Sequence, residues 1–206
     1  MPAFDEALLA RARDHLAAFP RRATEWDGLR PAAVAVVLLG DDEARACFLL
    51  TRRAAALRVH AGQWALPGGR IEDGERAEGA ALRELWEEVG LGLGGESVLG
   101  LLDDYPTRSG FVITPVVVWA GPVGELHPDP DEVQEVHRVP LADLEGPGVP
   151  RLIHIPESER PVIQMPILGT TLHAPTAAVL YQLCEVVVHG RTTRVDHLEQ
   201  PVWAWT

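Results

Sequence analysis

Three carboxylates stand close together in the stretch GGRIEDGERAEGAALRELWEEVGL, at Glu84, Glu87 and Glu88. In a helix with about 100° of rotation per residue, they fall within an arc of roughly 100° on one face, and apolar residues fill the adjoining arc. The pattern alone has two interpretations. One is a solvated acidic face, in which like charges repel one another. The other is a site for a hard divalent cation, since Mg²⁺ prefers carboxylate oxygens and keeps several waters for a phosphate ligand.

The residues before these glutamates favour the metal site. Pro67, Gly68 and Gly69 form a turn in which a bare backbone carbonyl is able to approach a cation, because glycine adopts conformations that other residues avoid. Glu75 precedes Arg83 by a spacing that lets an ion pair hold the loop to the helix. We therefore expect a loop, a helix and a second loop that together build a cation site.

From Gly69 onward the sequence reads G-x5-E-x7-R-E-L-x-E-E-x-G-L, ending at Leu91, with every fixed position filled. This stretch resembles the signature of the Nudix hydrolases. The resemblance implies an α/β Nudix fold, an α/β/α sandwich with a mixed sheet and a loop-helix-loop catalytic motif. It also implies Mg²⁺- or Mn²⁺-dependent cleavage of a nucleoside diphosphate linked to another group. By position it implies a structural ion pair between Glu75 and Arg83.

The same resemblance implies the site residues, and it leaves open which glutamate takes the proton from water. The metal ligands that it implies are the Gly68 carbonyl, Glu84, Glu87 and Glu88. The residues grouped with catalysis are Arg83, Glu84 and Glu87. Bound cations would neutralise a pyrophosphate and help to create a hydroxide nucleophile.

A second motif lies upstream, in LLTRRAAALRVHAGQWALPGG. It is similar to the signature L-L-T-x-R-[SA]-x3-R-x3-G-x3-F-P-G-G of the coenzyme A pyrophosphatase branch, with Leu66 in place of phenylalanine. The similarity implies a coenzyme A-like nucleotide substrate, cleaved to 3′,5′-ADP and 4′-phosphopantetheine. Arginines suit bidentate phosphate contacts, and coenzyme A carries a 3′-phosphate besides its diphosphate. The candidate substrate-binding residues are Arg53, Arg58, Gly62 and, as a base-stacking wall, Trp64; His60 is expected to be a loop histidine.

Two other functions compete with coenzyme A hydrolysis. Pro106 follows Leu91 at a spacing reminiscent of Nudix enzymes that cleave ADP-ribose, so ADP-ribose, NADH or another nucleoside diphosphate derivative is an alternative substrate. A catalytically silent Nudix-fold ligand sensor is the third hypothesis. The complete set of acidic positions argues against silence.

The overall composition limits the partners. Of the residues, 47% are apolar and 23% charged, and the formal net charge is −12. An acidic chain is unsuited to binding nucleic acid or an anionic membrane surface, and an anionic substrate then calls for a mediating cation. No apolar stretch approaches the roughly 20 residues of a membrane helix, and the start lacks a signal-peptide core. A cytoplasmic protein is expected, in which Cys47 and Cys184 are small buried residues.

The pattern of elements predicts one domain over residues 1–206. We expect an N-terminal helix over about 4–19, strands in 30–53, 111–121 and 132–141 and a last helix over about 175–189. Within the Nudix box at 69–91 we expect a helix over about 77–89 that ends at Gly90. Residues 145–172 are rich in proline and are expected to be irregular. Trp203 and Trp205 lie on an apolar tail suited either to a homodimer partner or to packing on the same chain. Four residues are candidates for an additional acid contributed by a loop, although a surface or turn role is favoured for each: Asp103, Asp104, Glu132 and Glu135.

Overall fold

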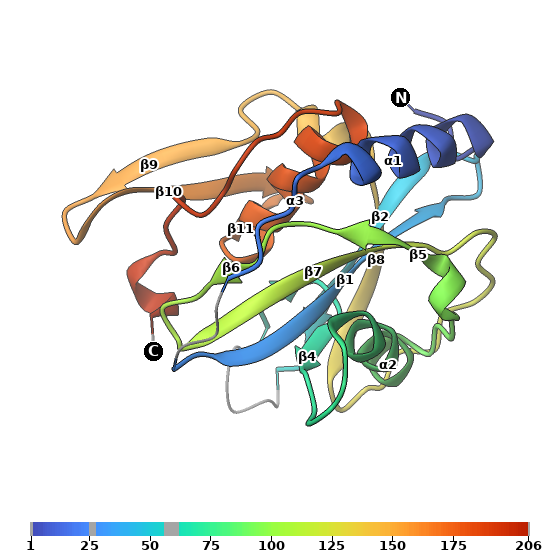
Figure 1. Cartoon of the computed structure of the whole chain (residues 1–206), viewed down its shortest axis with the longest axis horizontal. Coiled ribbons are helices and arrows are strands. Elements are labelled where there is room, and N and C mark those ends of the chain that lie inside the picture. The colour runs from blue at the N-terminus through green and yellow to red at the C-terminus, as the bar shows by residue number, and fades with distance from the viewer. Residues whose placement is uncertain (1, 25–27, 56–61, 206) are drawn as a thin grey trace.

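The computed structural model describes residues 2–24, 28–55 and 62–205 (Figure 1). Its α-helices are α1 (Glu6–Ala18), α2 (Ala77–Val89) and α3 (Thr176–Leu183). Its strands are β1 (Arg30–Gly40), β2 (Ala46–Arg53), β3 (Trp64–Ala65), β4 (Gly68–Arg70), β5 (Val98–Leu101), β6 (Tyr105–Pro106), β7 (Phe111–Trp119), β8 (Val133–Pro140), β9 (Arg151–Ile155), β10 (Ser158–Ile167) and β11 (Thr170–His173). The helix α2 occupies the predicted positions, whereas α1 is shorter than the predicted 4–19.

The long apolar strands β1, β2 and β7 form the centre of the main sheet, whose order is β3-β2-β1-β7-β5. Strand β8 adds to β2, β4 adds to β1 and β6 adds to β7. The pair β1–β7 is parallel and the other pairs are antiparallel, so the sheet is mixed. Strand β1 carries apolar residues on both faces because both faces are covered.

Helices cover the two faces of this sheet, with α1 and α3 above it and α2 below it in Figure 1. On the first face, Leu8 of α1 and Leu180 of α3 pack in one buried cluster with Leu38. On the second face, Leu85 and Val89 of α2 pack in another cluster with Val37, Leu39 and Val118. The predicted α/β/α sandwich with a mixed sheet is therefore confirmed.

Helix α2 ends where the sequence predicts because the signal for its end is local. Its final backbone N–H, from Gly90, donates to the carbonyl of Trp86, and Gly90 has the left-handed φ of 72° that glycine tolerates best. At the start of α1, the Asp5 side chain accepts a hydrogen bond from the Leu8 N–H at 2.8 Å. This cap places the beginning of α1 after Phe4.

The prediction that residues 145–172 are irregular is wrong. They contain a 3-10 turn ending at Glu145 and most of a three-stranded antiparallel sheet in the order β11-β10-β9, whose long hairpin projects as an orange arm in Figure 1. Pro161 lies where the register between β9 and β10 shifts. Pro166 lies beyond Gln164, which is the last residue of β10 that pairs with β9. Prolines are tolerated at bulges and at positions with a free edge, so they do not prevent this sheet.

The last predicted helix is interrupted. Helix α3 ends at Leu183, and the chain continues as a π-helical turn over Cys184–Val188. Cys47 and Cys184 are both free and buried, as expected. Among the described residues, none of the helices combines the length and the apolar character that crossing a lipid bilayer requires.

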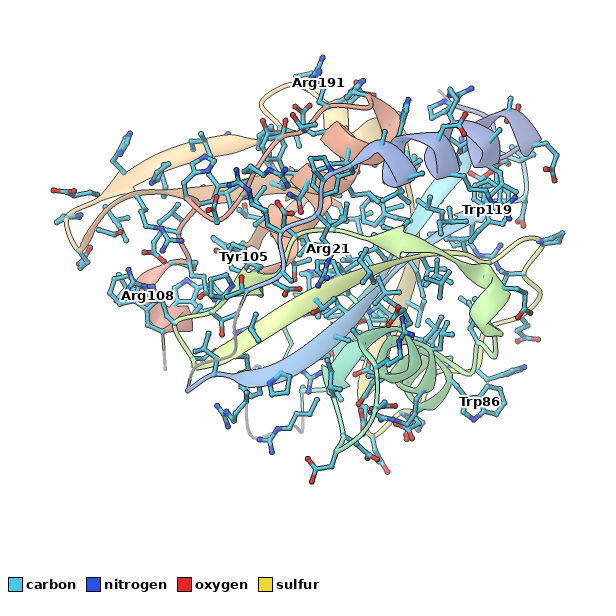
Figure 2. The ribbon with its side chains drawn as sticks, viewed as in Figure 1. Arg21, Trp86, Tyr105, Arg108, Trp119 and Arg191 are labelled. Atoms are coloured by element: carbon cyan, nitrogen blue, oxygen red, sulfur yellow. The ribbon has the colours of Figure 1, made fainter. Side chains whose placement is uncertain are left out.

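The surface role expected for Asp103 and Asp104 is wrong, because they are only 5% and 4% exposed. Asp103 accepts hydrogen bonds from Arg194 at 2.8 Å and from the Gln182 side chain at 2.9 Å. Asp104 accepts from Arg21 at 2.6 Å, and Figure 2 shows Arg21 in the middle of the molecule, between α1 and the sheet. These carboxylates join distant segments of the chain, which explains their burial.

Candidate active site beside the glutamate helix

Helix α2 exposes its three glutamates to different degrees. Glu88 is 3% exposed as a residue, whereas the side chains of Glu84 and Glu87 are 15% and 52% exposed. The difference follows from the helix orientation, since Leu85 packs into the core and Glu88 lies one helical turn further along, beside it. The acidic face is therefore partly enclosed rather than freely solvated.

The Gly68–Gly69 turn lies directly against two of these carboxylates. The Gly68 N–H donates to Glu88 Oε2 at 3.2 Å. A Cβ on Gly69 would collide with the Glu84 carboxylate, and one on Gly68 would collide with the backbone of β1 at Ala33 and Val34. Only glycine permits this close approach of the turn to the helix and the strand.

Arg83 holds the glutamates and the preceding loop in place. Its guanidinium donates to Glu84 at 2.8 Å, to Glu87 at 2.9 Å and to both oxygens of Glu75 at 3.1 Å. It also donates to the Arg70 carbonyl at 3.0 Å. The structure thus contains the Glu75–Arg83 ion pair implied by the signature and gives Arg83 a positioning role for the carboxylates.

Glu88 is a buried carboxylate whose negative charge is only partly balanced by its neighbours. Burial raises the pKa of Glu88 to about 7, and the nearby charges of Glu84 and Glu132 act in the same direction. Arg53, 3.6 Å away, and the Gly68 N–H oppose the rise. Burial also raises the pKa of Glu84, against the effect of Arg83. A cation would stabilise the ionised form of both groups, because an opposite charge close to a carboxylate lowers its pKa.

The donor set fits Mg²⁺ or Mn²⁺, since carboxylate and backbone carbonyl oxygens are the ligands that these ions prefer. The three glutamates do not converge on one point, because Arg83 draws Glu84 and Glu87 toward itself. In the part of the chain that the structure describes, the one group of three ligand atoms within 4.8 Å of one another is elsewhere, at Glu145, Cys184 and His189. Burial raises the pKa of the Cys184 thiol to about 12, which disfavours the thiolate that a metal ion needs.

A cavity of about 550 Å³, here called the main cavity, opens beside the glycine turn. The end of the main sheet lines one part of it, and β11, α3 and the C-terminal segment line another. The residues that line it include Ala32, Val34, Arg53, Gly62, Trp64, Leu66, Gly68, Gly69, Arg70, Phe111, Leu172, His173, Gln200 and Trp203. The cavity is therefore largely apolar but meets charged groups at the turn that contacts Glu84 and Glu88.

Most of the predicted substrate-binding residues meet at this cavity. Arg53, Gly62 and Trp64 all line it, and Trp64 also contacts His137 edge to face at 5.0 Å between ring centroids. The Arg53 Nε is buried and has no hydrogen-bond partner among the described residues. Arg58 and His60 lie outside the described residues, so their predicted roles are not placed.

The C-terminal segment contributes cavity residues that the sequence analysis missed. Gln200, Trp203 and Ala204 line the main cavity, and the Trp203 ring meets the His173 ring edge to face at 5.3 Å. The apolar character of this tail was visible in the sequence, but its place on the cavity depends on contacts with β10 and β11. The Trp203 side of the cavity could therefore not be located from the local sequence.

Glu199 holds this segment in place, and its lowered pKa should make the stability of the fold depend on pH. Burial opposes its ionisation, but hydrogen bonds from Arg108 at 2.6 Å and from Ser158 and the Gln200 N–H lower its pKa from 4.5 to about 2; Figure 2 shows Arg108 beside the C-terminal segment. A depressed pKa stabilises the fold fully above about pH 4.5, and this contribution is lost as the pH falls toward 2.

We expect Glu199→Gln to lower the free energy of unfolding by on the order of 3 kcal/mol at pH 7. Urea unfolding of the unmodified chain and of the variant at pH 7, 5, 4 and 3 measures the difference in their free energies of unfolding. The effects of the other carboxylates are common to both proteins and cancel in this difference. The difference should shrink steadily below pH 4.5. A difference that stays constant down to pH 3 would contradict the role of the Glu199 charge.

Comparisons with known proteins place this site in a family. Residues 29–159, well over half of the chain, match the family model described as NUDIX domain. A protein named "Uncharacterized Nudix hydrolase NudL" from Cronobacter sakazakii is 43% identical over 115 residues, which cover 55% of this chain and 59% of that protein. The protein of the same name from Pectobacterium atrosepticum is 46% identical over 94 residues, covering 45% of this chain and 49% of that protein. The chain thus spans only about half to three fifths of the length of these relatives.

A MutT/nudix family protein from Enterococcus faecalis has a similar solved structure, with a TM-score of 0.53 over 90% of this chain and 75% of that chain. At 19% sequence identity, this likeness concerns the fold alone. The glycine turn, the glutamate helix and the central strands β1, β2 and β7 all lie within the matched residues 29–159. The chain belongs to the Nudix family.

Proposed function

We propose that this chain is a Mg²⁺- or Mn²⁺-dependent Nudix pyrophosphatase that hydrolyses the diphosphate of coenzyme A or its thioesters. The observation that carries the proposal is the position of Arg53. It belongs to the motif similar to the coenzyme A branch, it lines the main cavity and its guanidinium lies 3.6 Å from Glu88. One residue therefore joins the implied substrate motif to the implied metal site.

Glu84, Glu88 and the Gly68 carbonyl are the groups proposed to hold the cation, with Glu87 as a further ligand or base. When bound, the cation neutralises the diphosphate, polarises a P–O bond and lowers the pKa of the attacking water. Arg83 keeps Glu84 and Glu87 oriented through its hydrogen bonds to both. The guanidinium of Arg53, next to Glu88, is suited to contact the diphosphate oxygens.

In the proposed reaction a water oxygen bonds to one phosphorus atom and the bridging P–O bond breaks. The water proton goes to a carboxylate, and the bridging oxygen leaves with the other phosphate. The products are 3′,5′-ADP and 4′-phosphopantetheine or its acyl derivative. The apolar part of the main cavity, between Leu66, Leu172 and Trp203, is suited to the pantetheine arm because that arm has few charges.

A substrate panel tests this function. The full chain is assayed with Mg²⁺ and with Mn²⁺ on coenzyme A, acetyl-coenzyme A, ADP-ribose, NADH and diadenosine polyphosphates. We expect kcat/KM to be highest for coenzyme A or its thioester. A preference for ADP-ribose or NADH would contradict the proposed substrate but not the proposed diphosphate hydrolysis. No turnover of any compound would favour a silent ligand sensor.

A further inference from the structure

A second group of cations borders the main cavity, away from Arg53. In the parallel register of β1 and β7, Arg30 lies beside Phe111 and Ala32 beside Ile113, while Arg70 of β4 lies beside Ala32. Alternate residues of a strand share a face, and Ala32, Arg70 and Phe111 line the cavity. The fold therefore places Arg70 and Phe111 in the lining of the cavity, with Arg30 next to Phe111.

The Arg30 guanidinium packs over the Phe111 ring, and the Arg70 guanidinium lies farther from the same ring. The Arg30 guanidinium carbon lies 3.9 Å from the centroid of the Phe111 ring, and that of Arg70 lies 5.7 Å from it. Arg30 also donates to the Ser109 carbonyl at 3.0 Å. Stacking on a ring uses the flat face of a guanidinium and leaves the N–H groups at its edge available for an anion. Both arginines are exposed, so a ligand is able to reach them.

These cations lie a short way from the proposed metal site. Arg70 directly follows the Gly68–Gly69 turn, and its carbonyl accepts the hydrogen bond from Arg83. Gly69 contacts Glu84 on one side of the turn, while Arg70 lines the cavity. Arg70 and the glycine turn beside Glu84 and Glu88 thus border the same cavity, so one ligand is able to reach both Arg70 and the proposed cation site.

We propose that Arg30, which packs over Phe111, and Arg70, which lies near the same ring, bind a phosphate monoester that the substrate carries in addition to its diphosphate. In coenzyme A this group is the 3′-phosphate of the ribose. The proposal rests on the proposed function and divides the phosphate contacts between two sites. Arg53, beside Glu88, contacts the diphosphate, and Arg30 and Arg70 near Phe111 distinguish a 3′-phosphorylated nucleotide from one without that group.

Binding of two product-like nucleotides to the full chain without metal tests the site separately from turnover. Isothermal titration compares 3′,5′-ADP with 5′-AMP for the unmodified protein and for Arg30→Ala and Arg70→Ala. We expect 3′,5′-ADP to bind about ten- to hundredfold more tightly than 5′-AMP, because charged hydrogen bonds to phosphate have this magnitude. Each substitution should remove most of that preference and leave the affinity for 5′-AMP nearly unchanged.

The controls separate recognition from folding and from general charge. Arg13→Ala removes an exposed arginine from α1 and should not alter the preference, and Arg30→Met retains an apolar contact with Phe111 if Arg30→Ala unfolds. In turnover, the two alanine variants should raise KM for coenzyme A but not for 3′-dephospho-coenzyme A, whereas Arg53→Ala should impair both.

Three results would overturn the site: no preference in the unmodified protein, equal losses for both nucleotides, or loss of the preference in Arg58→Ala and not in the other variants. Failure of the proposed function gives a different result. A protein that never cleaves coenzyme A but retains an Arg30- and Arg70-dependent preference for 3′,5′-ADP would lose the proposed activity and keep the phosphate site.

Discussion

Replacement of Glu88 by glutamine is expected to lower kcat by about two to four orders of magnitude while the fold remains intact. Glu88 is the most buried of the three glutamates, and an amide cannot supply the negative oxygen that a hard cation requires. Loss of several kcal/mol of cation-dependent stabilisation of the transition state corresponds to this range. Steady-state kinetics with the best substrate of the panel, at saturating Mn²⁺, measure the change.

The free energy of unfolding of the Glu88→Gln variant should rise or stay unchanged. Glutamine retains an oxygen to accept the Gly68 N–H, and it removes a carboxylate whose ionisation burial opposes. Urea unfolding without metal should therefore show a free energy of unfolding equal to or above that of the unmodified chain. Titration with Mn²⁺, followed by electron paramagnetic resonance, should show weaker binding.

The matched control is Glu78→Gln, on the first turn of the same helix. Glu78 pairs with Arg76 and is not among the residues proposed to hold the cation. This variant should retain near-normal kcat and Mn²⁺ affinity. Near-normal turnover of Glu88→Gln, with unaltered Mn²⁺ binding, would remove Glu88 from the metal site.

The predictions from sequence were most accurate where the signals are local. The bounds of α2 follow from a short apolar period and from Gly90, and the close approach of Gly69 to Glu84 agrees with the loop-helix-loop that the Nudix resemblance implies. Each of these signals lies within one stretch of chain, so no long-range pairing had to be known. The same reasoning located the strands β1, β2 and β7 from their apolar runs.

The walls of the main cavity were much less accessible to sequence reasoning. Arg30 and Arg70 both lie near Phe111 only because β1 pairs with β7 in parallel and with β4 in antiparallel register. Trp203 reaches the cavity because Glu199 pairs with β10 and with Arg108. The register of strands distant in sequence depends on the packing of the whole sheet, and no local pattern in these segments encodes it.

The burial of Asp103 and Asp104 could not be predicted from the local sequence either. Their local sequence, LDDYP, has the composition of a solvent-exposed turn. The partners that make burial favourable, Arg21 and Arg194, lie about 80 to 90 residues away in the chain. A carboxylate is buried only when cations and N–H groups surround it in the fold.

Asp104→Ala is therefore expected to destabilise the fold by about 3–5 kcal/mol, the usual cost of removing one partner of a buried ion pair. The substitution deprives Arg21 of a contact at 2.6 Å, the Thr24 N–H of one at 2.8 Å and the Thr114 hydroxyl of one at 2.7 Å. These groups connect the segment after α1 to strand β7. Urea unfolding at pH 7, monitored by tryptophan fluorescence and by circular dichroism, measures the loss.

Two further variants distinguish the buried network from a general effect of charge. Asp104→Asn retains an oxygen acceptor but not the charge, so its loss should be smaller than that of the alanine variant. Asp131→Ala removes an exposed acid from the loop before β8 and should change the stability by less than about 0.5 kcal/mol. If Asp104→Ala were no more destabilising than Asp131→Ala, the carboxylate would not connect the segment after α1 to the sheet. The burial of Asp104 would then have to be explained by the packing of Tyr105, its fully buried neighbour.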